Sequence, residues 1–320
     1  MMRKVVVSAA VLAAAALLSA APAAAQVDGQ VIYGSDDRID LYQTESAKLK
    51  SLADSTVALL PASSVKTEGD VAKLQTEPYG PGMGLCEEEP FYEQVTAAFC
   101  SGSLVAPDII MTAGHCVTSD ERCSDTKFVF GFAIKEKGKL PFEVPAGDVY
   151  GCERLLGREQ VNSGADWALI KLDRPVTGHA PLKLNLTGII TNQTPIVVIG
   201  HPAGLPTKIA GGASVRDASP DGYFVANLDT YGGNSGSAVF NAKTGLVEGI
   251  LVRGETDYTY RGSCRVSNVC TDDACRGEDV TKIGSVVDKL PGEQHRSRVA
   301  ELAPTVAALL DAVSAAQPRP

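Results

Sequence analysis

From residue 99 onward the sequence is a succession of short β-type segments, and no long helical pattern interrupts them. The segments are rich in β-branched residues and are separated by Gly, Pro, Asn and Asp, which is typical of strands joined by turns. We expect strands at residues 99–105, 108–112, 127–134, 167–172, 195–199, 223–228, 237–240 and 246–252. Many short strands without alternating helices predict an all-β barrel or sandwich rather than a parallel sheet.

The first 25 residues have the pattern of a secretory signal peptide. Arg3 and Lys4 precede an apolar run at 5–18, and Ala23 to Ala25 supply the small residues that signal peptidase needs. A membrane anchor is the alternative, but the run is short for a span and dominated by alanine. We therefore expect cleavage before Gln26 and a protein that is secreted or periplasmic.

The two flanks of the β-rich region differ from it. Residues 26–84 are polar and loosely patterned, with one expected strand at 55–60 and a turn-rich end, so we interpret them as an N-terminal arm or a propeptide. Residues 291–320 are expected to form a C-terminal helix and tail, because Pro304 can open a helix. Its apolar face would comprise Val306, Leu309, Leu310 and Val313.

Composition and charge narrow the classes of partner. Apolar residues make up 44% and charged residues 21% of the chain, which is typical of a globular protein with a core. Loss of two of the 29 basic residues with the signal peptide, against 38 acidic ones, takes the net charge from −9 to −11. Such a surface repels nucleic acid and anionic lipid. We expect no nucleic-acid partner, no membrane association after signal removal, no cofactor and a monomeric state.

Eight cysteines occur in the sequence, and an even number in an exported chain favours disulfides. Either four bridges form, or three form and leave a free pair; Cys264, Cys270 and Cys275 are close enough in sequence for at least one local bridge. The same three cysteines fit no familiar zinc spacing and have no histidine nearby. Neighbouring acidic residues could bind calcium, but a solvated disulfide loop is the preferred interpretation. Those residues are Asp272, Asp273, Glu278 and Asp279.

Three local motifs could carry chemistry. Two apolar strands form a hairpin that ends in His115, between small residues and Cys116, and Cys100 could bridge this hairpin from its other strand. Such a bridge is worth about 3 kcal/mol in the chain-entropy model. A histidine in this setting can be held and still be reached, as a general base must be.

The other two motifs supply an acid and a hydroxyl group. Asp166 stands just before a buried strand, where its carboxylate needs a donor such as an imidazole N–H, although a surface cap of the strand is the simpler alternative. Ser235 lies between Gly233 and Gly236 on a tight turn, and this is suited to an exposed nucleophile. A plain turn is the alternative; a phosphate loop would require a lysine and a following helix.

Together these motifs resemble the chymotrypsin-like (trypsin-like) serine peptidases. The order His, Asp, Ser is that of this family. Residues 112–116 are similar to its histidine motif, and Asp166 with its apolar strand to its aspartate motif. Residues 233–237 resemble the serine motif in the form found in the bacterial glutamyl-endopeptidase-like branch. Two further segments are also similar to that branch: Gly200-His201-Pro202, and Val31-Ile32 followed by Asp37-Arg38.

The resemblance implies a fold and an activity. The fold would be two six-stranded antiparallel β-barrels in a peptidase domain at 85–290, split near residue 185, with a C-terminal α-helix. The chain would be a secreted serine endopeptidase that cleaves proteins or peptides through an acyl-enzyme. Ser235 would be the nucleophile, His115 the general base and Asp166 the residue that orients it, with the N–H groups of Gly233 and Ser235 as the oxyanion hole.

The resemblance also implies substrate-binding residues and a Cys100–Cys116 disulfide. Val252 and Gly254 would lie on the edge that pairs with an extended substrate. Asp229 stands where trypsins bind Lys or Arg, whereas Thr230 matches a pocket residue of glutamyl endopeptidases. Specificity for the residue before the cut therefore stays open.

The sequence departs from the family at two informative positions. Asn234 replaces the aspartate that pairs with a new N-terminus in digestive relatives, so activation of a zymogen by that switch is not expected, and the mature chain begins at Gln26 or Val31. Leu251 replaces the histidine of glutamyl endopeptidases. We expect Arg253 to be a solvated rim residue and His201 a loop residue. The competing functions are a catalytically silent binding protein and an esterase with the same triad.

Overall fold

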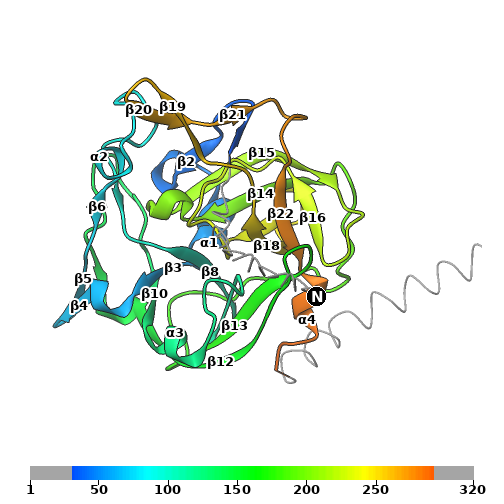
Figure 1. Ribbon diagram of the computed structural model, residues 1–320. Helices are drawn as coiled ribbons and strands as arrows, with labels where there is room; N and C mark the ends of the chain where they lie inside the picture. Colours follow the sequence, from blue (N-terminus) through cyan, green and yellow to red (C-terminus); the bar gives the residue numbers. More distant parts are fainter. Residues whose placement is uncertain (1–30, 292–320) are drawn as a thin grey trace, which may run out of the picture.

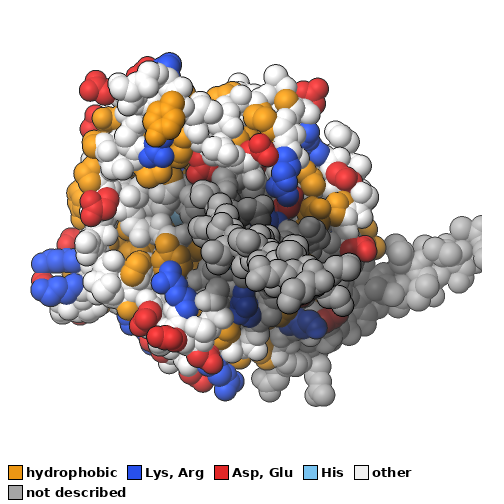
Figure 2. Space-filling model, viewed as in Figure 1, with side chains coloured by type: hydrophobic (Ala, Val, Ile, Leu, Met, Phe, Trp, Pro, Cys, Tyr) orange, Lys and Arg blue, Asp and Glu red, His pale blue; other side chains and the backbone are white. Residues whose placement is uncertain are grey.

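The computed structural model describes residues 31–291 (Figure 1). The expected signal peptide at 1–25 and the expected helix from Pro304 lie outside the described residues. In the part that is described, no helix is long and apolar enough to cross a membrane. Acidic and basic side chains are interspersed over the face seen in Figure 2 and form no large patch of one sign.

Six antiparallel strands close the first barrel, in the order β10-β12-β13-β9-β8-β3. The strands are β3 (Thr56–Pro61), β8 (Cys100–Ala106), β9 (Ile109–Thr112), β10 (Thr126–Phe130), β12 (Val149–Gln160) and β13 (Asp166–Leu172). Both faces of β3 are buried: Val57 and Leu59 join the barrel core, while Ala58 and Leu60 pack under a second sheet. This alternation follows from the two-residue period of a strand.

The second barrel also has six antiparallel strands, in the order β14-β17-β18-β22-β16-β15, and the pairing of β14 with β15 closes it. The strands are β14 (Pro195–Gly200), β15 (Lys208–Asp217), β16 (Tyr223–Ala226), β17 (Ala238–Asn241), β18 (Val247–Arg253) and β22 (Glu278–Lys282). The fold is therefore the expected pair of six-stranded barrels. The expected split near residue 185 falls in the connection from β13 to β14.

Shorter elements cover the barrels. The strands are β1 (Ile32–Tyr33), β2 (Arg38–Asp40), β4 (Val65–Glu68), β5 (Val71–Leu74), β6 (Glu77–Pro78), β7 (Val95–Thr96), β11 (Glu143–Pro145), β19 (Tyr258–Arg261), β20 (Cys264–Ser267) and β21 (Val269–Cys270). The helices are α1 (Ala47–Ala53), α2 (Tyr79–Met83), α3 (Asp120–Ser124), α4 (Gly284–Val287) and the single turns Leu41–Gln43, Ala62–Ser64, Ala146–Asp148 and Pro202–Gly204. The outer sheet β11-β5-β4 packs against β3 and β10.

The expected boundary between an arm at 26–84 and a peptidase domain from 85 is wrong, because both barrels use strands that precede it. β3 closes the first barrel, and β2 pairs with β15 of the second. The β2–β15 contact includes a buried ion pair in which the ammonium group of Lys208 donates to Asp40 Oδ1 at 2.6 Å and to Gln94 Oε1 at 2.8 Å. Burial lowers the pKa of Lys208 to about 8.

Each of the nine expected strands has a counterpart, within a few residues at its ends, whereas β12, β15 and β22 were not expected. The unexpected strands are poor in the apolar pattern that predicts a strand: β12 carries charged residues along an exposed side, β15 contains Gly211 and Gly212, and β22 begins with Glu278 and Asp279. Their pairing to distant strands, rather than local propensity, decides their conformation.

All eight cysteines are paired, and this confirms four bridges. The bridges are Cys86–Cys264, Cys100–Cys116, Cys123–Cys152 and Cys270–Cys275. One of them is local among the last three cysteines, as expected. The first closes a separation of 178 residues and ties the segment after α2 to the β19–β20 hairpin.

If β3 is part of the first barrel, a charge in it will be poorly tolerated. Val57 has no exposed surface. We predict that Val57→Asp lowers the free energy of unfolding by about 3 kcal/mol or more, because it buries an unpaired carboxylate. The control Thr67→Asp, on the exposed strand β4, should change it by no more than about 0.5 kcal/mol. Urea unfolding followed by circular dichroism measures both, and equal small effects would contradict the placement of β3.

Candidate active site

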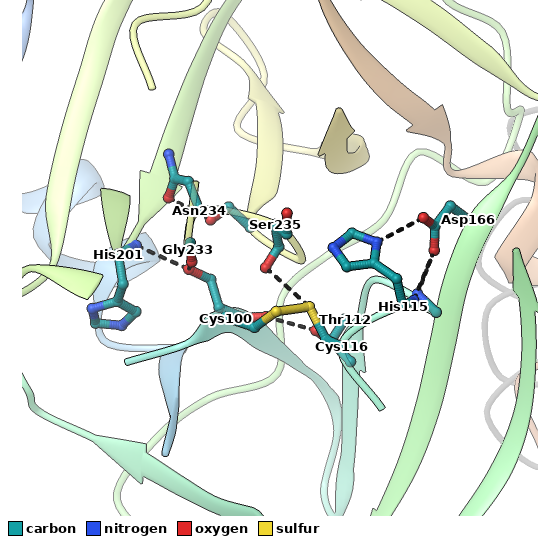
Figure 3. Close-up of a disulfide and its surroundings, with 12 residues drawn as sticks. Cys100, Thr112, His115, Cys116, Asp166, His201, Gly233, Asn234 and Ser235 are labelled. Atoms are coloured by element: carbon teal, nitrogen blue, oxygen red, sulfur yellow. Dashed lines mark hydrogen bonds and ion pairs between the residues drawn. A yellow bond between two sulfur atoms is a disulfide. The ribbon is translucent and has the colours of Figure 1, made fainter. Parts of the chain in front are cut away.

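The structure brings His115, Asp166 and Ser235 together between the two barrels. Asp166 is the first residue of β13, and His115 follows the end of β9 by three residues. β9 and β13 are antiparallel neighbours with Thr112 opposite Ala168, so the same register carried two residues further sets Gly114 beside Asp166. Figure 3 shows the imidazole of His115 between the carboxylate of Asp166 and the side chain of Ser235.

Every hydrogen bond at the carboxylate of Asp166 orients the histidine. His115 Nδ1 lies 2.7 Å from Oδ2, and Oδ1 accepts from the backbone N–H of Gly114 at 2.6 Å and of His115 at 3.2 Å. Because an ionised carboxylate only accepts, Nδ1 carries the proton and Nε2 is the free acceptor. Thr281 Oγ1 bonds to both the N–H and the carbonyl of Asp166 at 3.0 Å.

Gly114 is required for this arrangement. A Cβ atom on it would stand 2.1 Å from the carbonyl oxygen of Glu159 and 2.8 Å from that of Trp167. Both oxygens belong to backbone, which cannot move aside as a flexible side chain could. The small residue before the histidine therefore lets the loop approach the β12–β13 ladder closely enough for its N–H to reach Asp166.

The turn that carries Ser235 is held by its neighbours on all sides. Gly233 and Gly236 adopt positive φ values of 90° and 91°, which favour glycine. The carbonyl of Ser235 accepts from Ser101 N–H at 2.8 Å, and Gly236 N–H donates to the carbonyl of Leu251 at 2.8 Å. Asn234, 2% exposed, donates to Thr230 Oγ1 and accepts from Ser237 Oγ at 2.7 Å.

Two backbone N–H groups of this turn are left for an outside acceptor. In the described part of the chain no group accepts from Gly233 N–H or from Ser235 N–H. The carbonyl of Gly232 accepts from Ala203 N–H at 2.6 Å. Since the N–H and C=O of one trans peptide point in opposite directions, Gly233 N–H is directed away from Ala203. Two such donors on one turn can stabilise a negatively charged oxygen.

Ser101 is a contributor that the sequence reasoning missed. Its Oγ donates to the carbonyl of Gly233 at 3.0 Å and accepts from His201 N–H at 2.9 Å. Ser101 follows the bridged Cys100 in the first barrel, whereas Gly233 and His201 belong to the second. It therefore helps to fix the Ser235 turn against the strand that leads to His115. Only its place next to Cys100 gave a signal in the sequence.

The structure does not place Asp229 at an open pocket. Asp229 is 2% exposed, and its two oxygens accept from the backbone N–H groups of Tyr33 and Asp37, each at 2.7 Å. Burial raises its pKa to about 7, in spite of these two donors. The carboxylate of Asp229, expected among the substrate-binding residues, therefore binds the segment around β1 and β2 instead.

The other expected substrate-binding residues are near the Ser235 turn. Thr230 is buried beneath Asn234, and Val252 is buried in β18. Gly254 is partly exposed just after β18, and a Cβ on it would stand 1.8 Å from Glu278 Oε2. Glu278 is fully buried, and burial raises its pKa well above the usual range.

The expectation for His201 is confirmed, whereas that for Arg253 needs correction. His201 lies in the connection between β14 and the Pro202–Gly204 turn, as expected for a loop residue, but it is buried. It is 1% exposed, its Nδ1 lies 3.0 Å from the carbonyl of Leu205, and burial lowers its pKa to about 4. Arg253 is not a solvated rim residue, since only 12% of its side chain is exposed and it donates to Asp279 at 3.1 Å. The burial of Arg253 could not be expected from the sequence because its partners are distant in the chain.

The known proteins to which this chain is similar include several peptidases. Residues 100–250 match the trypsin-like peptidase domain. The chain is 35% identical over 105 residues to human chymotrypsin-like elastase family member 3B, across 32% of this chain and 38% of that protein. It is 27% identical over 150 residues to the glutamyl endopeptidase of Bacillus licheniformis, across 44% of this chain and 45% of that protein. It thus spans less than half the length of these curated relatives.

A solved structure of a glutamyl endopeptidase covers 81% of this chain and 97% of its own, at 18% identity and a TM-score of 0.46.

The raised pKa of Asp229 gives a pH test of its burial. Between about pH 4 and pH 7 the folded chain keeps a proton that the unfolded chain has released, so this residue makes the fold less stable as pH rises through that window. Asp229→Asn should be less stable than wild type, because the NH2 group of the amide cannot accept from the second of the two N–H donors. The gap in unfolding free energy between wild type and variant should be smaller at pH 8 than at pH 5. A gap that urea titrations find to be constant would contradict the burial of this carboxyl.

Proposed function

We propose that this chain, a chymotrypsin-like serine peptidase by the family of its residues 100–250, is an exported endopeptidase that hydrolyses proteins or peptides through an acyl-enzyme. The observation that carries the proposal is the imidazole of His115, which is bonded through Nδ1 to buried Asp166 and lies beside Ser235 (Figure 3). A buried carboxylate, a histidine of fixed tautomer and a serine hydroxyl beside it are what nucleophilic catalysis by serine needs.

The reaction would proceed in two halves. In the first, Ser235 Oγ attacks the scissile carbonyl while His115 Nε2 takes its proton, and the imidazolium then gives this proton to the leaving amine. In the second, water attacks the acyl-enzyme, His115 takes a proton from the water and Ser235 regains one as the acid leaves. Asp166 holds the tautomer and stabilises the imidazolium in both halves.

The N–H groups of Gly233 and Ser235 would bind the oxyanion of each tetrahedral intermediate. Their lack of a described acceptor supports this role. One such donor is worth about 3 kcal/mol of transition-state stabilisation in related chemistry. The positive φ values of Gly233 and Gly236 support it too, because they set the turn that leaves both groups open.

The substrate would bind as an extended strand along Val252–Gly254. Leu251, the residue before this segment, accepts from the N–H of Gly236, so the segment starts beside the nucleophile turn. An extended peptide that pairs with such a segment has its backbone fixed next to Ser235. Four disulfides support export, since such bridges persist in oxidising compartments.

We predict that replacing Ser235 with alanine lowers turnover by about 10⁶-fold. The mature protein is incubated with a diverse peptide mixture, and the products are read by mass spectrometry. Ser219→Ala, an exposed serine between β15 and β16, is the matched control and should cleave like wild type. The residues that precede the cuts then define specificity.

Other results would favour the competing functions. Hydrolysis of small aryl esters without any peptide cleavage would make the protein an esterase. No hydrolysis of either substrate, by the full chain or by a chain that begins at Val31, would make it a silent binding protein and contradict the proposal.

A further inference from the structure

Arg253 connects the two halves of the candidate site. It is the last residue of β18 in the second barrel. Its guanidinium donates to the carbonyls of Val161 at 3.2 Å and Gly164 at 2.8 Å, in the turn between β12 and β13 of the first barrel. Nε donates to Asp279 Oδ2 at 3.1 Å in β22. With 12% of the side chain exposed, these bonds are largely shielded from water.

The turn that Arg253 holds leads directly into Asp166. Val161 and Gly164 belong to a tight turn in which Gly164 N–H donates to Val161 at 3.1 Å and Val161 N–H to Ala165 at 2.9 Å. Asp166 follows Ala165 as the first residue of β13. Holding two carbonyls of this turn therefore fixes the position from which the Asp166 side chain starts.

The guanidinium is also an electrostatic neighbour of Asp166. Arg253 Nη1 lies 4.0 Å from Asp166 Oδ2, the same oxygen that lies 2.7 Å from His115 Nδ1. This separation is too long for a hydrogen bond but short for two charges in a site whose carboxylate is 3% exposed. The cation attracts the carboxylate without competing for the lone pair that the imidazole uses.

The same strand also contacts the turn that carries the nucleophile. Leu251, two residues before Arg253 in β18, accepts from Gly236 N–H at 2.8 Å, next to Ser235. One strand of the second barrel thus reaches the Ser235 turn through its backbone and Asp166 through the side chain of Arg253. Its position sets the distance between the hydroxyl on one barrel and the imidazole on the other.

We propose that Arg253 is a positioning residue for the reaction, which holds the Asp166–His115 pair of the first barrel in register with Ser235 of the second. The inference rests on the proposed peptidase function. Arginine suits the task because its planar group offers five donors in fixed directions, and here it serves two carbonyls and a carboxylate at once. Lysine would keep the charge but lose this fork.

Arg276 provides a matched control. It also contacts Asp279 Oδ2 and loses the same charge when replaced, but its other hydrogen bond is to the carbonyl of Gly277, in its own segment. Its side chain is 44% exposed. A comparison of Arg253→Ala with Arg276→Ala therefore separates the link across the barrels from the loss of a cation beside Asp279.

The test is steady-state hydrolysis of a peptide that wild type cleaves. We expect Arg253→Ala to lower kcat by about 100-fold, the cost of a small misplacement of catalytic groups, while KM changes by less than about threefold. Arg253→Lys should lose less, and Arg276→Ala should stay within about twofold of wild type. Guanidinium ion at millimolar concentration should restore activity to Arg253→Ala and should not change the activity of the other variants. A loss confined to KM, or an equal loss in Arg276→Ala, would overturn the proposal.

A spectroscopic readout keeps this test separate from that of the peptidase function. The proton on His115 Nδ1, bonded to Asp166, should give a low-field NMR resonance, assigned by its absence in His115→Ala. We expect this resonance in wild type and Arg276→Ala, and expect it to be lost or broadened in Arg253→Ala and partly kept in Arg253→Lys. An unchanged resonance in folded Arg253→Ala would overturn the positioning role even if the chain cleaved no peptide.

Discussion

The rest of the site depends on the burial of one carboxylate. Asp166 is 2% exposed, and a charge so far from water is stable only when donors surround it. Its donors are the N–H groups of Gly114 and His115 and the imidazole Nδ1–H, so satisfying Asp166 also sets the loop after β9 and the tautomer of His115. The absence of a side chain on Gly114 allows this approach. The need to surround one buried carboxylate with donors thus fixes the position and the tautomer of His115, the proposed proton acceptor.

At the site, polar contacts join the two barrels in addition to the apolar core that they share. Ser101 braces the Ser235 turn from the first barrel, and Arg253 reaches back from the second to the turn before Asp166. Thr281 of β22 closes the same seam by bonding to both backbone groups of Asp166. Because hydrogen bonds are directional, such contacts fix orientation more tightly than apolar packing does. The proposed chemistry needs this, since its groups come from different barrels.

The nine expected strands could be predicted, because each depends on a local pattern of apolar and turn residues. The pair of barrels and the grouping of His115, Asp166 and Ser235 were implied by the resemblance to the chymotrypsin-like serine peptidases. What could not be predicted depends on distant partners. β22 begins with two buried acids, and Asp279 is tolerated there because Arg253 and Arg276 meet it. Asp229 was expected to bind substrate, but its carboxylate accepts from the backbone N–H groups of Tyr33 and Asp37, almost 200 positions away. The prediction of a separate arm at 26–84 was wrong for the same reason, because β2 and β3 pair with strands that are distant in sequence.

The central claim is that His115 and Asp166 activate Ser235 as a nucleophile, and a small fluorophosphonate that reports only on that step tests it most directly. We predict that the probe adds one phosphonyl group to Ser235 of the wild-type chain, located by peptide mass spectrometry. The rate of labelling should fall by several orders of magnitude in His115→Ala and in Asp166→Asn, while Ser219 stays unlabelled. Labelling that is absent in wild type, or that persists unchanged without His115, would contradict the account.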